Sequence, residues 1–141
     1  MSDITDLSFS ELKKMLQKKS LSSTEMTTAF LDRIESLNPE LNTFITITRD
    51  EAMQSAKNAD KAISRGTATA YTGLPIAHKD LFCTDGVLTT CGSKILSNFV
   101  APYDAHVVSR CKAAGLVSLG KLNMDEFAMG SSNENSYFGP V

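Results

Sequence analysis

Lys79 is the residue whose surroundings most suggest reactivity, because it interrupts an otherwise apolar run. Residues 74–77 before it and 81–82 after it are apolar or small, apart from proline. In a central strand such a lysine would be desolvated, and desolvation lowers the pKa of an amine so that it can act as a base near neutral pH. Two other arrangements remain open: an edge-strand lysine that points into water, or a lysine paired with the neighbouring Asp80.

A second candidate region is the segment 124–141, which is rich in glycine, serine and asparagine. This composition is typical of a loop that approaches a site. Ser131 and Ser132 follow Gly130 and offer two adjacent hydroxyl groups, so the segment either supplies a nucleophile or has a structural role.

Metal and phosphate sites are not predicted. The two histidines and three cysteines lack the short spacing of structural zinc sites; Cys83 and Cys91, for example, are too far apart. The glycines fit neither the dinucleotide fingerprint nor the phosphate-loop spacing. The sequence therefore indicates no metal ligands and no nucleotide chemistry within this chain.

Length and composition indicate one globular unit. The chain has 141 residues, 42% of them hydrophobic, and a net charge of −2, which argues against nucleic-acid binding by this chain alone. Four lysines at residues 13–19 are interpreted as a solvated face, with docking of tRNA or a partner as the alternative. No apolar run approaches the ~20 residues of a membrane span and no signal peptide is recognisable. We expect a cytoplasmic protein with reduced thiols.

The elements that would position these residues fall into two parts, because all eight glycines lie at or after Gly66. We expect residues 1–66 to form a helical N-terminal segment and residues 67–141 to form strands and a helix of an α/β core, together one incomplete domain.

Helices in the first part are predicted from capping boxes, in which a serine or threonine caps the helix and a glutamate three residues later bonds back to it. Ser8 with Glu11, Ser22 with Glu25 and Thr48 with Glu51 have this spacing. We expect the second helix to stop at Asn38-Pro39 and the third, over residues 50–65, to end at Gly66. Residues 43–48 between them are predicted to be extended.

In the second part a helix over residues 105–114 is predicted, with Asp104 as its N-cap. A short strand over residues 116–119 follows, and residues 120–123 are expected to turn out of it. A helix followed at once by a strand is half of a βαβ unit, so a mixed, mostly parallel sheet flanked by helices is expected.

Four sequence stretches carry a resemblance to a known family. Residues 73–80, Gly-Leu-Pro-Ile-Ala-His-Lys-Asp, resemble the first motif of the amidase signature family. Residues 89–94, 120–130 and 131–136 resemble, more narrowly, the branch formed by the A subunits of glutamyl-tRNA(Gln) amidotransferases. The resemblance covers the whole chain. Residues 123–130, Asn-Met-Asp-Glu-Phe-Ala-Met-Gly, form a long string that is specific to that branch.

The resemblance implies the N-terminal part of the amidase signature fold and assigns roles to three residues. In that family the lysine matching Lys79 is the catalytic base, which acts through a serine in a cis peptide linkage on a nucleophilic serine. It implies that the strand over residues 76–82 is central and that Lys79 is nearly buried. Met129 and Gly130 are expected to line the substrate pocket; the alternative is that Met129 only fills core space.

The resemblance also implies the reaction and its partners. In that branch the A subunits hydrolyse glutamine and supply ammonia for converting Glu-tRNA(Gln) to Gln-tRNA(Gln), together with B and C subunits. ATP and Mg are expected at the B subunit, and no cofactor is expected in this chain. Neither catalytic serine is matched, because the Gly-Gly-Ser-Ser-Gly-Gly loop that holds them does not occur in these 141 residues. We therefore interpret the chain as an N-terminal fragment that is inactive alone; the alternatives are a noncatalytic binding module for the partner subunits and a fragment of a stand-alone amidase.

Overall fold

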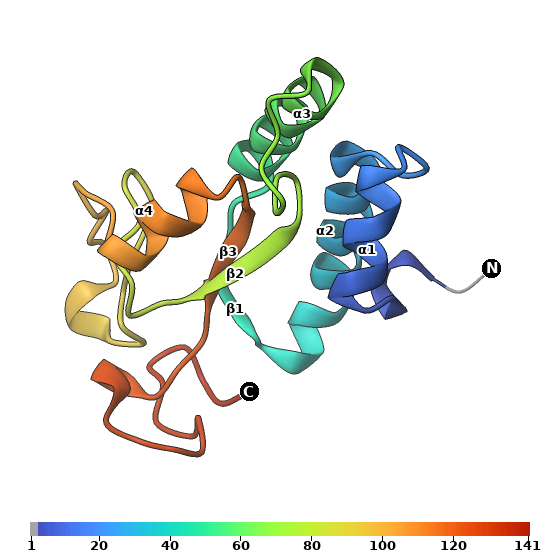
Figure 1. The fold of residues 1–141 in the computed structure, drawn as a ribbon. Helices are drawn as coiled ribbons and strands as arrows, with labels where there is room; N and C mark the ends of the chain where they lie inside the picture. Colours follow the sequence, from blue (N-terminus) through green and yellow to red (C-terminus); the bar gives the residue numbers. More distant parts are fainter. Residues whose placement is uncertain (1–2) are drawn as a thin grey trace.

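The computed structural model describes residues 3–141, which form a small sheet with helices on both sides (Figure 1). The longer elements, in chain order, are α1 (Phe9–Gln17), α2 (Ser23–Leu41), β1 (Phe44–Ile47), α3 (Arg49–Arg65), β2 (Pro75–Lys79), α4 (His106–Ala113) and β3 (Val117–Leu122). Three short 3-10 turns complete them: η1 (Ile4–Asp6), η2 (Lys94–Leu96) and η3 (Glu126–Ala128).

The first two helices begin where the sequence predicts. Ser8 and Ser22 each accept a hydrogen bond from the backbone three residues on, and Glu11 and Glu25 bond back to them, so both capping boxes are complete. The predicted end of α2 is wrong, because the helix continues through Pro39 to Leu41. A proline near the last turn removes only one backbone hydrogen bond, and the helix ends instead at an asparagine, residue 42, in the left-handed conformation.

The ends of α3 and α4 differ in detail from the predictions. The side chain of Thr48 makes no capping hydrogen bond, although α3 begins next to it and ends at Gly66 as expected. Asp104 does not cap α4, whose N-cap is Ala105. The Asp104 carboxylate is instead paired with the ammonium of Lys112 at 2.7 Å and accepts the backbone N–H of residue 85.

The three strands form a mixed sheet in the order β1-β3-β2, in which β3 pairs antiparallel with β1 and parallel with β2. The predicted central strand from Ile76 is therefore not central among the described residues: β2 lies at an edge, and it ends at Lys79 because residues 79–82 turn. The predicted turn at residues 120–123 is also wrong, since Gly120 to Leu122 continue β3. A Cβ on Gly120 would collide with the carbonyl oxygen of Thr46, so glycine allows the two strands to approach.

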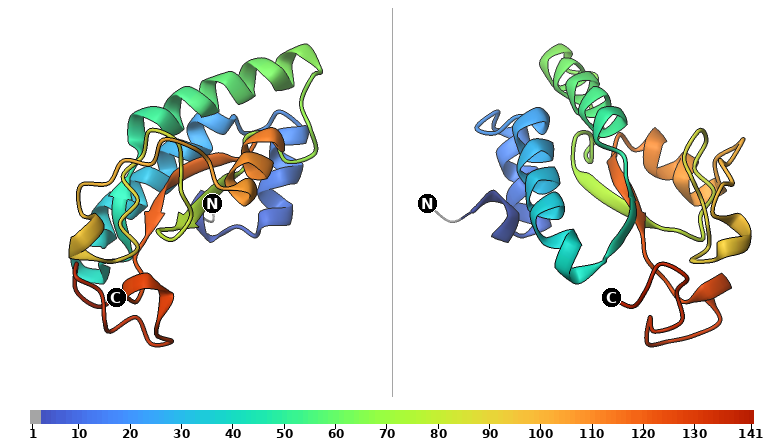
Figure 2. Two further views of the ribbon diagram at one scale, coloured as in Figure 1. Left: turned by 90° about the vertical axis from the view of Figure 1, so that its left-hand side faces the viewer. Right: turned by 180° about the vertical axis from the view of Figure 1, so that it is seen from behind.

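Two apolar clusters pack the first three helices, α1, α2 and α3, together and against the sheet. One joins α1, the start of α2 and Leu74, and the other joins α2, α3 and the buried side chains of Val117 and Leu119 on β3. Helix α4 lies on the other side of the sheet from α1 and α2 (Figures 1 and 2). Within residues 3–141, none of the helices combines the length and the apolar character needed to cross a membrane.

Candidate active site

Lys79 is the last residue of β2 and its side chain is exposed. Its neighbours His78 and Asp80 are both buried, so the alternation of an extended chain turns Lys79 away from the interior. Among residues 3–141 no side chain forms a hydrogen bond or ion pair with its amine. The expectation of a nearly buried Lys79 is thus wrong for this structure, and the edge-strand arrangement is the one observed, because no described strand pairs with the outer edge of β2.

The buried lysine is Lys121, one strand away on β3, whose side chain has essentially no exposed surface. Its ammonium donates hydrogen bonds to the carbonyl oxygen of Phe82 and to the hydroxyl of Thr89, both at 2.8 Å. The carboxylate of Asp80 lies 3.3 Å away. Burial lowers the pKa of Lys121, and the negative charge of Asp80 partly opposes this effect.

Asp80 connects this buried charge to the turn that follows Lys79. Its Oδ2 accepts hydrogen bonds from the backbone N–H of Thr90, at 2.8 Å, and from the Thr90 hydroxyl. Its Oδ1 receives no hydrogen bond and has the Lys121 ammonium as its charged neighbour. Its backbone N–H and carbonyl bond to Leu122 and Cys91. The possible pairing of Asp80 with Lys79 is therefore not observed, since Asp80 pairs with Lys121.

The loop after Thr90 links the end of β2 to the C-terminal segment. The carbonyl oxygen of Cys91 accepts the backbone N–H of Phe127 at 2.9 Å, and that of Gly92 accepts the N–H of Tyr137 at 2.8 Å. A Cβ on Gly92 would lie 2.5 Å from the carbonyl oxygen of Met124, at a φ of +66°, so this contact requires glycine. Lys79 and the segment around Met129 are thus attached to the same loop.

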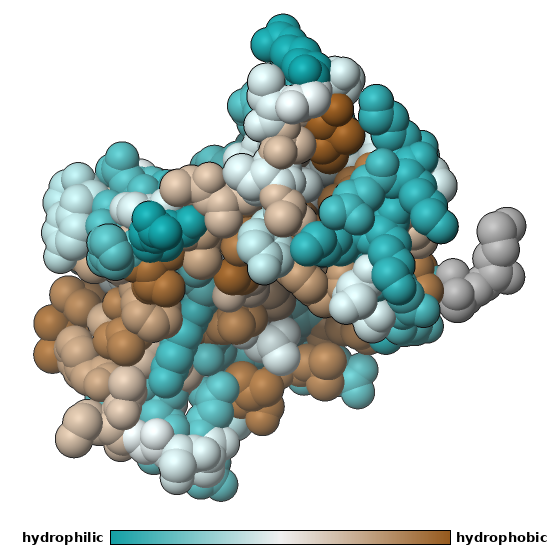
Figure 3. All heavy atoms as spheres, viewed as in Figure 1, coloured by the Kyte–Doolittle hydropathy of each residue, from teal (hydrophilic) through white to brown (hydrophobic). Residues whose placement is uncertain are grey.

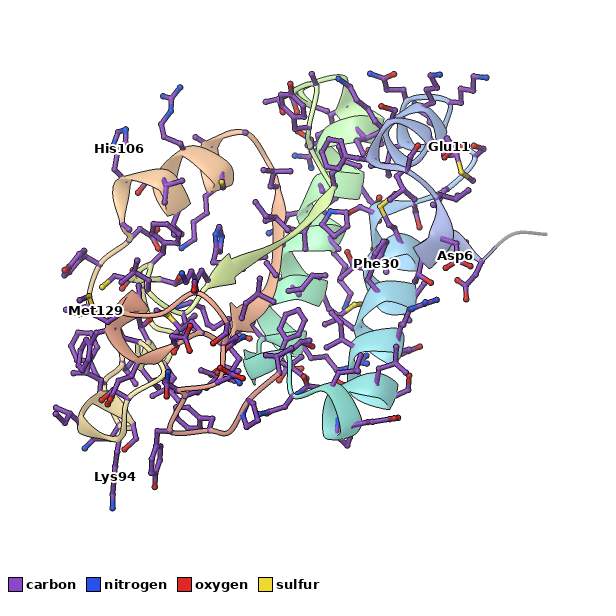
Figure 4. All side chains as sticks on the ribbon, turned by 90° about the horizontal axis from the view of Figure 1, so that it is seen from below. Asp6, Glu11, Phe30, Lys94, His106 and Met129 are labelled. Carbon is purple, nitrogen blue, oxygen red and sulfur yellow. The ribbon has the colours of Figure 1, made fainter. Side chains whose placement is uncertain are left out.

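Met129 follows η3 and is 84% exposed, so it does not fill core space among the described residues. Figure 4 shows it at the outer side of the molecule, far from Phe30 of α2. Gly130 lies next to the side chain of Asp125. A Cβ there would collide with Oδ2 of Asp125, which shows that the glycine is packed against this carboxylate. This packing leaves the expected contact between Gly130 and substrate untested.

Asp125 orders the segment that follows Gly130. Its two carboxylate oxygens accept the backbone N–H groups of Asn133 and Asn135, each at 2.9 Å. These hydrogen bonds, that of Asn135 first, lower the pKa of Asp125. Ser131 and Ser132 are exposed on this loop, and the hydroxyl of Ser132 bonds to Glu134. Neither serine has a lysine or histidine beside it in these contacts, which supports a structural role for the loop.

His78 lies on the face opposite Lys79, only 5% exposed, beside a cavity of about 180 Å³ between the sheet, α3 and α4. Burial and the positive charges of Lys121 and Lys112 lower the pKa of His78, which disfavours its charged form. Across the part of the chain that the structure describes, no three histidine, cysteine, aspartate or glutamate side chains gather as metal ligands would.

The residues missed by sequence reasoning are Lys121 and its partner Asp80. Lys121 follows a glycine and precedes Leu122-Asn123, which is typical of a turn, so a buried position was not indicated. The only signal for Lys121 was the motif itself, since the string that begins at Gly120 is part of the family resemblance.

Comparison with known proteins places this geometry in a family. A sequence model described as Amidase matches residues 25–141. The chain belongs to the amidase signature family. This amidase-family chain is 64% identical over 134 residues to the A subunit of the glutamyl-tRNA(Gln) amidotransferase of Aromatoleum aromaticum, and 59% identical over 131 residues to that of Coxiella burnetii. Those stretches are 95% and 93% of this chain but 27% of each relative, so the chain spans about a quarter of their length.

Solved structures agree with the fold. The chain superimposes with a TM-score of 0.89 and 36% identity on a protein from a vestigial complex related to the origins of an s-triazine catabolic enzyme, over 94% of this chain and 30% of that one. It superimposes with a TM-score of 0.82 and 31% identity on the peptide amidase of Stenotrophomonas maltophilia, over 99% of this chain and 29% of that one. The N-terminal part of the amidase signature fold, expected from the motifs, is confirmed.

Proposed function

We propose that this chain is part of the glutamine-hydrolysing A subunit of a tRNA-dependent amidotransferase, and that Lys79 is its catalytic base. The observation that carries the proposal is the 64% identity to a named A subunit over nearly the whole chain, including the motif around Lys79. The identities to A subunits, 59–64%, exceed the 31–36% to the two solved structures above, which favours this branch over a stand-alone amidase.

The position of Lys79 supports this role. Lys79 ends β2, and β2 and β3 are parallel, so the carboxyl ends of both strands lie at one edge of the sheet, where α/β proteins commonly bind ligands. Its amine has no partner among the described side chains, but its exposure means that residues 3–141 do not themselves supply the burial expected of a base. The segment containing Met129 and Gly130 is attached to the same loop, and we propose that it lines the glutamine pocket.

In the proposed mechanism the neutral amine of Lys79 accepts a proton relayed from the nucleophilic serine through the cis-linked serine, both supplied by the family's glycine-serine loop. The activated serine attacks the carboxamide carbon of glutamine, and the carbon–nitrogen bond breaks as the relayed proton passes to the leaving nitrogen, which departs as ammonia. Water then hydrolyses the glutamyl–serine ester to glutamate and the free serine. The ammonia would be used with Glu-tRNA(Gln) at a B subunit, with ATP and Mg bound there, and a C subunit would complete the complex. None of the proposed steps on glutamine requires a cofactor bound by this chain.

The test is a grafted subunit, in which residues 1–141 replace the matching part of the Aromatoleum aromaticum A subunit, produced with its partner subunits. We expect ammonia release from glutamine by the graft and none by residues 1–141 alone. Lys79→Ala and Lys79→Arg should each lower the rate by roughly 10³-fold or more, because arginine does not give up its proton. Lys57→Ala, an exposed lysine on α3, is the matched control and should not change the rate. A Lys79→Arg graft with the parent rate would refute Lys79 as the base.

A second candidate, a noncatalytic binding module for the partner subunits, is favoured by one observation. Large apolar side chains are exposed on the loops beyond β2, among them Leu81, Ile95, Tyr103 and Met129, and Figure 3 shows hydrophobic surface on that side of the molecule. The two candidates differ in one result: a binding module would join the partner subunits but leave ammonia release unaffected by Lys79→Ala.

A further inference from the structure

The buried ion pair of Lys121 and Asp80 is unusual enough to need an explanation. Both side chains have essentially no exposed surface, and removing two charges from water costs several kcal/mol per ion unless hydrogen bonds compensate. Apolar residues of similar volume often stabilise a fold as well as such a pair does, so stability alone is a weak reason to keep it. The contacts of the pair indicate what else it does.

Every polar contact of the Lys121 ammonium lies on the chain that follows Lys79. The ammonium bonds to the carbonyl oxygen of Phe82, whose own N–H bonds to the carbonyl oxygen of Lys79 at 3.0 Å. It also bonds to Thr89 and is paired with Asp80, the residue directly after Lys79. A single buried cation therefore contacts two residues, Asp80 and Phe82, of the turn that terminates β2.

The Asp80 carboxylate extends this attachment to the second half of the site. It binds the N–H and hydroxyl of Thr90, and the next residue, Cys91, accepts the N–H of Phe127 two residues before Met129. The backbone at Lys79 is connected to the buried ion pair directly through Asp80, and the backbone that carries Met129 and Gly130 is connected to it through Thr90 and Cys91. Displacing the pair would therefore change the position of Lys79 relative to Met129 and Gly130.

We propose that Lys121, through its ion pair with Asp80, is a positioning residue that sets the placement of Lys79 relative to the segment 127–130. The inference rests on the function proposed above and deepens it. Lys121 itself touches no substrate, because its side chain is enclosed by Phe82, Thr89 and Asp80.

The test uses the grafted subunit with three variants. Lys121→Met keeps the volume of the side chain and removes its charge. Thr90→Val removes the hydroxyl, which donates to Asp80 and accepts the N–H of Gly92, and keeps the backbone N–H that bonds to Asp80. Lys112→Met is the matched control. Lys112 lies on α4 and forms a partly exposed ion pair with Asp104, which precedes the helix. For each graft we would measure kcat and KM for glutamine and the hydrogen exchange of residues 80–92 and 127–130.

We expect kcat to fall about 10- to 100-fold in Lys121→Met and about 5- to 20-fold in Thr90→Val, because a misplacement of about 1 Å can cost that much. KM should stay within about twofold, and Lys112→Met should match the parent. If Lys121→Met does not fold, Thr90→Val decides alone. A folded Lys121→Met or Thr90→Val graft with parental kcat would overturn the inference, and so would equal losses through KM.

Failure of the proposed function gives a different result. If the parent graft releases no ammonia while the native Aromatoleum protein does, the glutaminase proposal fails for this chain. Hydrogen exchange then decides the inference: faster exchange in both 80–92 and 127–130 in Thr90→Val supports one shared anchor, and unchanged exchange in 127–130 overturns it.

Discussion

Two lysines near the carboxyl ends of neighbouring parallel strands have opposite surroundings. Lys121 on β3 is enclosed and has three polar partners, whereas Lys79 on β2 is exposed and has none among residues 3–141. A buried ammonium is tolerated only where acceptors are already in place, and Lys121 has them because the loop after β2 folds over it. No side chain among residues 3–141 contacts the amine of Lys79 in this way. The comparison separates a lysine whose contacts hold the loop after β2 from one whose amine is left without contacts of its own.

The largest expected effect tests this separation directly. Lys121→Ala in the grafted subunit should destabilise the fold by roughly 3–5 kcal/mol, because it leaves the Asp80 carboxylate buried without its cation. Lys79→Ala should change stability by less than about 0.5 kcal/mol, as expected for an exposed side chain. Thermal unfolding would show a clearly lower apparent Tm for the first variant only. Equal shifts for the two variants would remove the distinction between the lysines.

The second-largest expected effect concerns Gly120, which precedes Lys121 on β3 and allows β3 to approach β1. Gly120→Ala should cost roughly 2–4 kcal/mol, because its Cβ would strike the backbone of β1 and its φ of +151° is unfavourable for alanine. Gly86→Ala is the control, since Gly86 also has a positive φ, +75°, but has open space around it. Its cost should be only about 1 kcal/mol. Thermal unfolding of both grafts measures the difference, and a Gly120→Ala graft as stable as Gly86→Ala would mean that β1 and β3 can separate without loss.

These glycines also show how far the sequence alone could lead. The starts of α1 and α2 were predictable because a capping box is complete within four residues. The continuation of β3 through Gly120 was not, because glycine followed by lysine is typical of a turn. Pairing with residues distant in the sequence keeps the segment extended, with Thr46 of β1 on one side and His78 of β2 on the other. The burial of Lys121 likewise depends on Phe82 and Thr89, which no local pattern connects to it.

The family motif and the local sequence pattern contributed different predictions for Lys79. Its apolar flanks suggested burial, yet the same flanks also suit an edge strand whose side chains alternate between interior and solvent. The family motif, rather than the flanks, is what identifies it as a candidate base. Asp80 was assigned as a possible partner of Lys79 because the two are adjacent, but adjacent residues in extended chain point to opposite faces.

A smaller effect distinguishes Met129 from Gly130. Gly130→Ala should loosen the loop at a cost of roughly 1–3 kcal/mol, because the added Cβ would displace the Asp125 carboxylate. Met129→Ala should leave stability unchanged, since the side chain is 84% exposed. If both residues line the glutamine pocket, each variant raises KM in the grafted subunit. A raised KM in Gly130→Ala with an unchanged KM in Met129→Ala would assign the effect to the loop and remove Met129 from the pocket.

The smallest effect is a pH dependence confined to this loop. Hydrogen bonds from Asn135 and Asn133 lower the pKa of Asp125, so the folded loop favours the carboxylate. The resulting stabilisation is complete above the ordinary aspartate value of about 3.9 and is lost as the pH falls below it, through the lowered pKa of the folded state. We expect the NMR signal of a labelled Met129 methyl group in the grafted subunit to change only in that acid range, and the change to be absent in Asp125→Asn. Thr90 bonds to Asp80 and not to Asp125, so a labelled Thr90 methyl group should keep its signal through the same titration. Simultaneous changes at Met129 and Thr90 would mean that the loop and the buried Lys121–Asp80 pair open together.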